Sequence, residues 1–271
     1  MMTQKIINWK YTLLRVLAFC MCCMIVLIVG SSLTKNLPKP WSELLLGIVA
    51  TVAVFGFTVL FSRWEKIRLD KLGVTPKKGT IRRFIFGFII GLLLSITHTA
   101  LVLLFSHAKI VSVSSLSFSA IVFTFLLYFV LALREELAFR GYPLRALYCS
   151  IGSWKSQIII AVIFSLEHIA GGYTITQAFL GAGTGAILFG IAALRSKGIA
   201  LPVGIHFAWN LGQWCVGFKN EPGIWNTIIE KGYESKHEQI TFIMYLIIMG
   251  FAILSFYLYR VTDQSKVHNR C

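Results

Sequence analysis

The strongest constraint in this sequence is the recurrence of apolar segments about 20 residues long, the length that an α-helix needs to cross ~30 Å of hydrocarbon. Hydrophobic residues make up 56% of the 271-residue chain and charged residues only 14%, and the mean hydropathy is +0.74. These values lie far from the soluble average, so most of the apolar surface must face lipid. The sequence therefore predicts an integral membrane protein.

Eight windows contain few or no charged residues, and we expect an all-α, polytopic transmembrane helical bundle of about eight spans. No segment between the windows reaches the ~50 residues of a typical separate domain, so residues 1–271 are expected to form a single integral membrane domain. The fifth window is short and the sixth is rich in glycine, which leaves seven spans or a re-entrant segment open. The windows are Leu13–Leu33, Trp41–Phe61, Phe84–Phe105, Leu116–Leu133, Gln157–Ala170, Thr174–Leu194, Ile199–Gly217 and Ile240–Tyr259.

The formal charge of +15 would suit a nucleic-acid-binding protein, but the basic residues follow the membrane topology instead of gathering on one domain. With eight spans and both termini in the cytoplasm, all but six of the 26 lysines and arginines lie on the cytoplasmic side. This asymmetry is the positive-inside pattern, so we expect the lipid bilayer as a partner and no nucleic acid. The six on the other side are Lys35, Lys39, Lys109, Lys219, Lys231 and Lys236.

Two adjacent glutamates stand at the end of the fourth window, in the stretch LREELAFRGY (133–142). Ionisable groups inside a bilayer cost several kcal/mol each, so each marks a functional site or a buried pair. Glu136 and Arg140 are four residues apart on one helix face and can form an ion pair. Glu135 lies 100° around the helix from Glu136, which leaves it unpaired and free to point into a cavity, where burial suits a carboxylate to general-base work.

Two later windows each add an imidazole. Phe164 and His168, in FSLEH, are four residues apart, so the phenyl ring would pack against the imidazole and fix its rotamer. His206 and Asn210, in HFAWN, share a helix face and can either bind a metal or donate two hydrogen bonds to an oxyanion. His98, in the third window, is expected to make only an interhelical hydrogen bond.

Taken in order, the three motifs EELAFR (135–140), FSLEH (164–168) and HFAWN (206–210) resemble a known signature. It is the E-E-x-x-x-R, F-x-x-x-H and H-x-x-x-N/D pattern of the type II CAAX prenyl endopeptidases and the related bacteriocin-processing or immunity proteins, the CPBP family. The resemblance covers about residues 116–217, which would be the catalytic region. It implies an intramembrane endopeptidase with eight helices around a cytoplasm-facing cavity.

The resemblance also implies roles for individual side chains. Glu135 and His168 would activate a water molecule, and His206 and Asn210 would form an oxyanion hole. Three further residues would support the site: Glu136, Arg140 and Phe164.

Whether such a site uses a metal is a separate question, because the family has also been described as metalloproteases. Glu135, His168 and His206 would then be the zinc ligands, a composition found in hydrolytic zinc sites. However, the H-E-x-x-H helix is absent from the sequence. With Glu135 as a ligand, the base would have to be Glu136, already matched to Arg140, or Glu167. The residues favour a metal-free glutamate mechanism without a cofactor, with zinc as the alternative.

Two other functions are compatible with the same residues. An immunity or regulatory protein could bind a peptide in the cavity without hydrolysing it, whereas a proton-relay transporter is disfavoured because no internal repeat is visible. The expected substrate is a membrane-bound peptide or protein: a prenylated CAAX protein, a peptide pheromone, a bacteriocin or a leader peptide. A small basic chain of this kind is expected in a bacterial cell membrane as a multi-pass protein.

Overall fold

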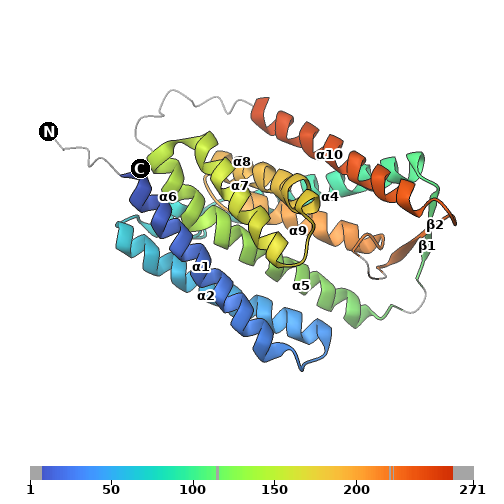
Figure 1. Cartoon of the computed structure of the whole chain (residues 1–271), viewed down its shortest axis with the longest axis horizontal. Coiled ribbons are helices and arrows are strands. Elements are labelled where there is room, and N and C mark those ends of the chain that lie inside the picture. Colours follow the sequence, from blue (N-terminus) through green and yellow to red (C-terminus); the bar gives the residue numbers. More distant parts are fainter. Residues whose placement is uncertain (1–7, 114–115, 220, 222, 259–271) are drawn as a thin grey trace.

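A computed structural model describes residues 8–113, 116–219, 221 and 223–258 of the chain. These residues fold into a bundle of long helices with one small β-ladder (Figure 1), which confirms the predicted all-α polytopic architecture. The elements are α1 (Trp9–Thr34), α2 (Lys39–Glu65), α3 (Leu69–Leu72), α4 (Thr80–Phe105), β1 (Ala108–Ser112), α5 (Phe118–Glu136), the π-helix η1 (Leu137–Gly141), α6 (Tyr142–Ile151), α7 (Ser153–Ala170), the π-helix η2 (Gln177–Ala182), α8 (Gly183–Ser196), α9 (Ala200–Cys215), β2 (Trp225–Ile229) and α10 (Glu234–Leu258).

Each of the eight predicted windows overlaps a helix, with Tyr259 at the end of the last window outside the described residues, but fewer helices are long and apolar enough to cross a membrane. Within the described residues six helical runs have that length and composition. The helices α7, with 18 residues, and α9, with 16, are outside this set. The six runs are Trp9–Thr34, Trp41–Glu65, Thr80–Phe105, Phe118–Ile151, Gln177–Ser196 and Glu234–Leu258.

The two ends of the bundle carry different connections. At one end, which we call the strand end, β1 and β2 pair antiparallel, with Ala108 opposite Ile229 (Figure 1). The turn between α1 and α2 lies at the strand end too, because Lys39 reaches Glu221 across 2.8 Å. At the opposite end, which we call the basic end, the connection between α2 and α4 packs on the turn between α8 and α9.

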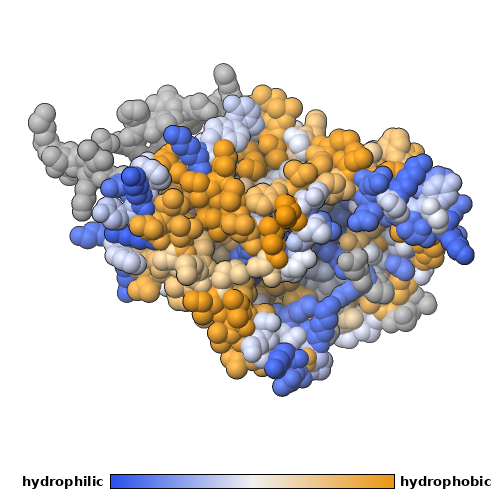
Figure 2. All heavy atoms as spheres, in the orientation of Figure 1, coloured by the Kyte–Doolittle hydropathy of each residue, from blue (hydrophilic) through white to orange (hydrophobic). Residues whose placement is uncertain are grey.

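The surface agrees with a bundle embedded in lipid. Figure 2 shows hydrophobic residues over the middle of this face and hydrophilic residues gathered at its two ends. Many large apolar side chains are exposed along α1, α2 and α4, for example Met21, Val52 and Ile96, where water would penalise them and acyl chains would not. The orientation of the termini stays a prediction, because residues 1–7 and 259–271 lie outside the described residues.

The fourth predicted window ends too early at Leu133. The helix continues without a break through η1 and α6, so one run of 34 residues extends from Phe118 to Ile151. Pro143 explains the π-helical turn that precedes it, because proline donates no N–H and its ring would clash with the carbonyl of Phe139 in a regular helix. The charged motif residues are thus in the middle of a span, and the sequence misplaced them at its end.

The helix α9 is fixed against α4 by glycines on both sides of the contact. A Cβ atom at Gly87 would strike the carbonyl of Leu201, and one at Gly91 would strike the backbone of Ile205. From the other side, a Cβ at Gly204 would meet the carbonyl of Phe84. The two backbones therefore touch directly, and this contact sets the position of the motif residues on α9.

The expected role of His98 is confirmed. Its Nε2 atom lies 3.0 Å from the carbonyl oxygen of Thr241, so the bond joins α4 to α10. The imidazole packs beside the Trp209 ring with 5.3 Å between centroids. This histidine ties three helices together and lies outside the motif cluster.

Candidate active site

A buried ion-pair network connects the first and third motifs. Arg140 donates from Nη1 to Glu136 Oε1 at 3.3 Å, the predicted i, i+4 pair, and both side chains have no solvent exposure. His206 Nδ1 lies 2.9 Å from the same Glu136 oxygen. Because an ionised carboxylate only accepts, Nδ1 carries the hydrogen. Glu136 therefore fixes the orientation of the imidazole as well as holding Arg140.

Aromatic rings surround the Arg140 guanidinium and join the network to the second motif. The guanidinium carbon lies 4.8 Å from the ring centre of Phe164 and 5.4 Å from that of Phe189, and the latter ring stacks on His206. Arg140 also donates to the carbonyl of Ala186 at 3.1 Å, which ties α8 to the site. Cation–π contacts of this kind stabilise a desolvated cation that has one carboxylate partner.

The expectation that Glu135 is unpaired is wrong. Arg134 Nη2 donates to Glu135 Oε1 at 2.7 Å, and Arg134 Nη1 donates to Glu167 Oε1 at 2.9 Å. One guanidinium thus bridges two carboxylates that are 15% and 14% exposed. The second oxygen of Glu135, Oε2, is directed toward His206, with 3.7 Å between Oε2 and Nε2.

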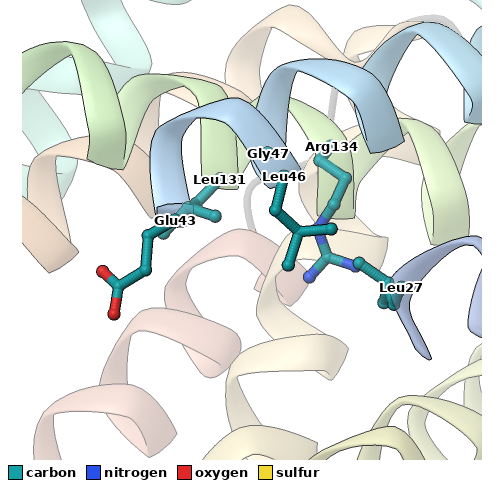
Figure 3. A pocket seen from close by; sticks show the side chains of 6 residues that line it. All are labelled: Leu27, Glu43, Leu46, Gly47, Leu131 and Arg134. Carbon is teal, nitrogen blue, oxygen red and sulfur yellow. The ribbon is translucent and has the colours of Figure 1, made fainter. Parts of the chain in front are cut away.

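Arg134 also borders a cavity beside the site. Figure 3 shows its guanidinium pointing into a space between α1, α2 and α5. The cavity has a volume of about 200 Å³ and is otherwise lined by Leu27, Glu43, Leu46, Gly47 and Leu131. The carboxylates of Glu135 and Glu167 therefore meet a cation with open space next to it, instead of being sealed in the core.

The second motif has the local geometry that its spacing predicts. Phe164 and His168 pack with 4.4 Å between ring centroids, and His168 Nδ1 lies 2.9 Å from the carbonyl oxygen of Phe164. The ring of Tyr173 packs edge-on against the His168 imidazole, with 5.0 Å between ring centroids. Within the described part of the chain no protein atom hydrogen-bonds Nε2 of His168, so that nitrogen is available to a ligand.

Asn210 has a partner that the sequence analysis did not assign to the site. Lys219, in the turn after α9, donates to Asn210 Oδ1 at 2.9 Å. Burial lowers the pKa of Lys219, and the negative charge of Glu135 acts in the opposite direction. The amide of Asn210 is therefore held through its oxygen, with its NH₂ group turned away from Lys219.

The three proposed zinc ligands are not grouped as a metal site. Glu135 already binds Arg134, whereas His168 and His206 turn Nδ1 to a protein acceptor, an orientation that metal-bound histidines also have. Among the described residues no three His, Cys, Asp or Glu side chains form a group that could hold a metal ion. A guanidinium in direct contact with a would-be ligand also repels a cation.

The site as a whole is a contact chain from three helices. His206 contacts Glu136, Glu136 contacts Arg140, Arg140 contacts Phe164, and Phe164 contacts His168. The arrangement defines a class: a polytopic α-helical membrane protein with a buried site of carboxylates and imidazoles.

The comparison with protein families is more specific. Residues 117–212 match the family model described as type II CAAX prenyl endopeptidase Rce1-like. The match confirms the resemblance that the three motifs carry, because all three lie inside the matched segment. It supports a CAAX-protease-like intramembrane peptidase as the general activity. A search among curated proteins finds no match to the chain.

Proposed function

We propose that this chain is an intramembrane endopeptidase that hydrolyses a peptide bond of a membrane-bound peptide or protein, with Glu135 as the general base. The observation that most supports this proposal is the position of Glu135 relative to His206. Oε2 of the carboxylate and Nε2 of the imidazole lie 3.7 Å apart, and Arg134 occupies only the other carboxylate oxygen. A base and a hydrogen-bond donor are thus directed at one small volume, as acyl transfer to water requires.

The proposed reaction assigns one step to each group. Glu135 removes a proton from a water molecule that His168 Nε2 helps to hold, and the water oxygen attacks the peptide carbonyl carbon. The carbonyl oxygen becomes an oxyanion, which receives hydrogen bonds from His206 Nε2 and the Asn210 amide. The C–N bond then breaks, and the proton held by Glu135 passes to the leaving amine nitrogen.

Glu136 supports the proposed role of His206. An imidazole that donates from both nitrogens is positively charged, and Glu136 lies 2.9 Å from Nδ1 to balance that charge. Arg140 holds the same Glu136 oxygen from the other side at 3.3 Å. We therefore assign Glu136 and Arg140 to positioning His206, and Phe164 to positioning His168 and Arg140.

We favour a glutamate-type hydrolase over a zinc enzyme. The support is the contact between Arg134 and Glu135, because a guanidinium bound to a would-be ligand repels a metal cation. Proteolysis in isolated membranes should then persist after treatment with a strong zinc chelator. Loss of activity on chelation, with recovery when zinc is added back, would instead establish the zinc enzyme.

The test compares new peptide termini in membranes of cells that carry the intact chain or Glu135→Gln at equal abundance. The substitution keeps the size of the side chain and removes the base, so the termini should disappear, and the sequences around them would identify the substrate class. Glu230→Gln is the matched control, because Glu230 is an exposed residue that pairs with His107 and belongs to none of the three motifs. Unchanged termini in Glu135→Gln would favour the peptide-binding immunity or regulatory protein.

A further inference from the structure

Two motif residues, His168 and Asn210, lie closer to the strand end of the bundle than to its basic end, whereas Glu135 lies midway along the helical run Phe118–Ile151. The helix α7 begins at the basic end, and His168 is its sixteenth residue of 18, about 22 Å from Ser153 at a rise of 1.5 Å per residue. Asn210 is the eleventh residue of α9, about 15 Å from Ala200.

The basic end is closed below the site. Every residue from 136 to 147 is buried, and Arg140, Tyr142, Leu144 and Leu147 have no exposed surface. Polar contacts seal the same region: Tyr142 donates its hydroxyl to Glu65 at 3.0 Å, and Arg145 donates to the carbonyl of Ala193 at 2.6 Å. The described residues 136–147 therefore form a packed layer between the site and the basic end.

The strand end is open by comparison. Residues 170–177, which connect α7 to η2, are all exposed, and one of them, Tyr173, packs directly on His168. Lys219 reaches Asn210 from the turn that leads to β2. The cavity beside Arg134 extends from that guanidinium toward Glu43, close to the α1–α2 turn (Figure 3). Figure 2 shows hydrophilic residues recessed between the apolar surfaces of this face.

The distribution of charged residues indicates which end of the bundle faces the cytoplasm. Exposed basic residues crowd the connection between α2 and α4, with Asp70 the only exposed or half-exposed acid from 66 to 83. The lysines of the strand end are accompanied by acids: Lys39 pairs with Glu221, and Glu230 and Glu234 follow β2. By the positive-inside rule the basic end faces the cytoplasm.

We propose that the active site is reached from the strand end, that this end lies outside the cytoplasm, and that the substrate is a peptide segment presented at the outer leaflet. The proposal departs from the cytoplasm-facing cavity that the family resemblance implies. Only one part of it rests on the proposed function, namely that the bound peptide is a substrate that the protein cleaves. Access itself is a property of the fold that can be measured without catalysis.

Thiol labelling with a charged, membrane-impermeant maleimide tests each part in the full-length chain. The background replaces all six cysteines of the chain with serine, among them Cys215, a half-buried free thiol near the strand end. Ser112→Cys, in β1, should react in intact cells, whereas Lys78→Cys, at the basic end, should react only after the cells are permeabilised. The reverse pattern would overturn the assignment of the strand end to the outside.

A third variant tests access to the site itself. Asn210→Cys places a thiol in the site, and a small impermeant reagent should modify it in intact cells, as it modifies Ser112→Cys. If Asn210→Cys reacts only after permeabilisation while Ser112→Cys reacts before it, access from the strand end is wrong although the orientation holds. None of these readouts depends on proteolysis, so a failure of the proposed function would be visible separately, as unchanged termini in Glu135→Gln.

Discussion

Lys219 donates a hydrogen bond from Nζ to Oδ1 of Asn210 across 2.9 Å, which joins the turn after α9 to the body of that helix. An ammonium group has three donors and no acceptor, so only the oxygen of the amide can face it. The NH₂ group of Asn210 must then point elsewhere, as an oxyanion hole requires. Lys219 is thus a positioning residue that selects one of the two orientations of the amide.

We expect Asn210→Asp to lower kcat by about 10²-fold or more, because it removes the donor and adds a negative charge where the oxyanion forms. The new carboxylate can still bind Lys219, so the thermal midpoint in detergent should change little. Lys219→Met should also lower kcat, by freeing the amide to rotate, and Lys219→Arg should recover part of it. Equal kcat in Asn210→Asp and the unaltered chain would contradict an oxyanion role for this residue.

The pH dependence of activity should report on Lys219. Burial lowers the pKa of its ammonium, so the group loses its proton at a pH below the ~10.4 of an ordinary lysine, while the nearby Glu135 charge limits the shift. Activity should therefore fall on the alkaline side as the ammonium becomes neutral and holds Asn210 less firmly. Lys219→Arg should move this alkaline limb upward, because arginine stays charged. An alkaline limb at the same pH in both proteins would assign it to another group.

Glu136 should matter for stability as much as for activity. Glu136→Gln leaves the buried Arg140 without a countercharge, and losing one partner of a buried ion pair costs about 3–5 kcal/mol. We expect a clear drop in the thermal midpoint in detergent, with partial recovery in Glu136→Gln/Arg140→Met. The exposed pair of His107 and Glu230 is the control, since Glu230→Gln should cost about 1 kcal/mol or less. A midpoint for Glu136→Gln as high as the control's would show that Arg140 finds another partner.

The contact between α4 and α9 can be tested with two glycines. A Cβ at Gly91 would strike the backbone of Ile205, which cannot move as a flexible side chain can, so Gly91→Ala should destabilise by about 1–3 kcal/mol. Gly56 is the control, because a Cβ there meets nothing within 4 Å. Since alanine favours helix over glycine by ~1 kcal/mol, Gly56→Ala should be neutral or stabilising. Similar midpoints for the two variants would argue against direct backbone contact.

Local spacing predicted the parts of this site that one helix can form alone. Glu136 with Arg140, and Phe164 with His168, are four residues apart, and helix geometry brings such pairs together whatever surrounds them. The apolar windows likewise predicted where the helices are, because lipid selects composition and length directly. The windows did not predict that the fourth span continues past Leu133. A sequence does not distinguish charged residues that are paired and buried from charged residues that are exposed to water.

The contacts between helices could not be predicted in the same way. Glu136 meets His206, and Arg134 meets Glu167, only because α5, α7 and α9 pack as they do. Adjacent residues on a helix do not face each other, so the bond from Arg134 to Glu135 depends on a long side chain folding back, which spacing does not indicate. Glu167 beside His168 was a visible signal: an acid in an apolar window that needs a partner.

Arg134 bridges Glu135 and Glu167. Because the two carboxylates share this guanidinium, we expect Glu167→Gln to change thermal stability in opposite directions with and without Arg134. In the intact chain, Glu167→Gln removes a countercharge from the 9%-exposed Arg134 and should destabilise. In Arg134→Met, two nearby carboxylates are left without a cation and repel each other, so the same Glu167→Gln should stabilise. Thermal midpoints of the four proteins in detergent would measure the cycle. If Glu167→Gln has the same effect in both backgrounds, the two carboxylates are not coupled through Arg134, and Glu167 has no part in positioning the base.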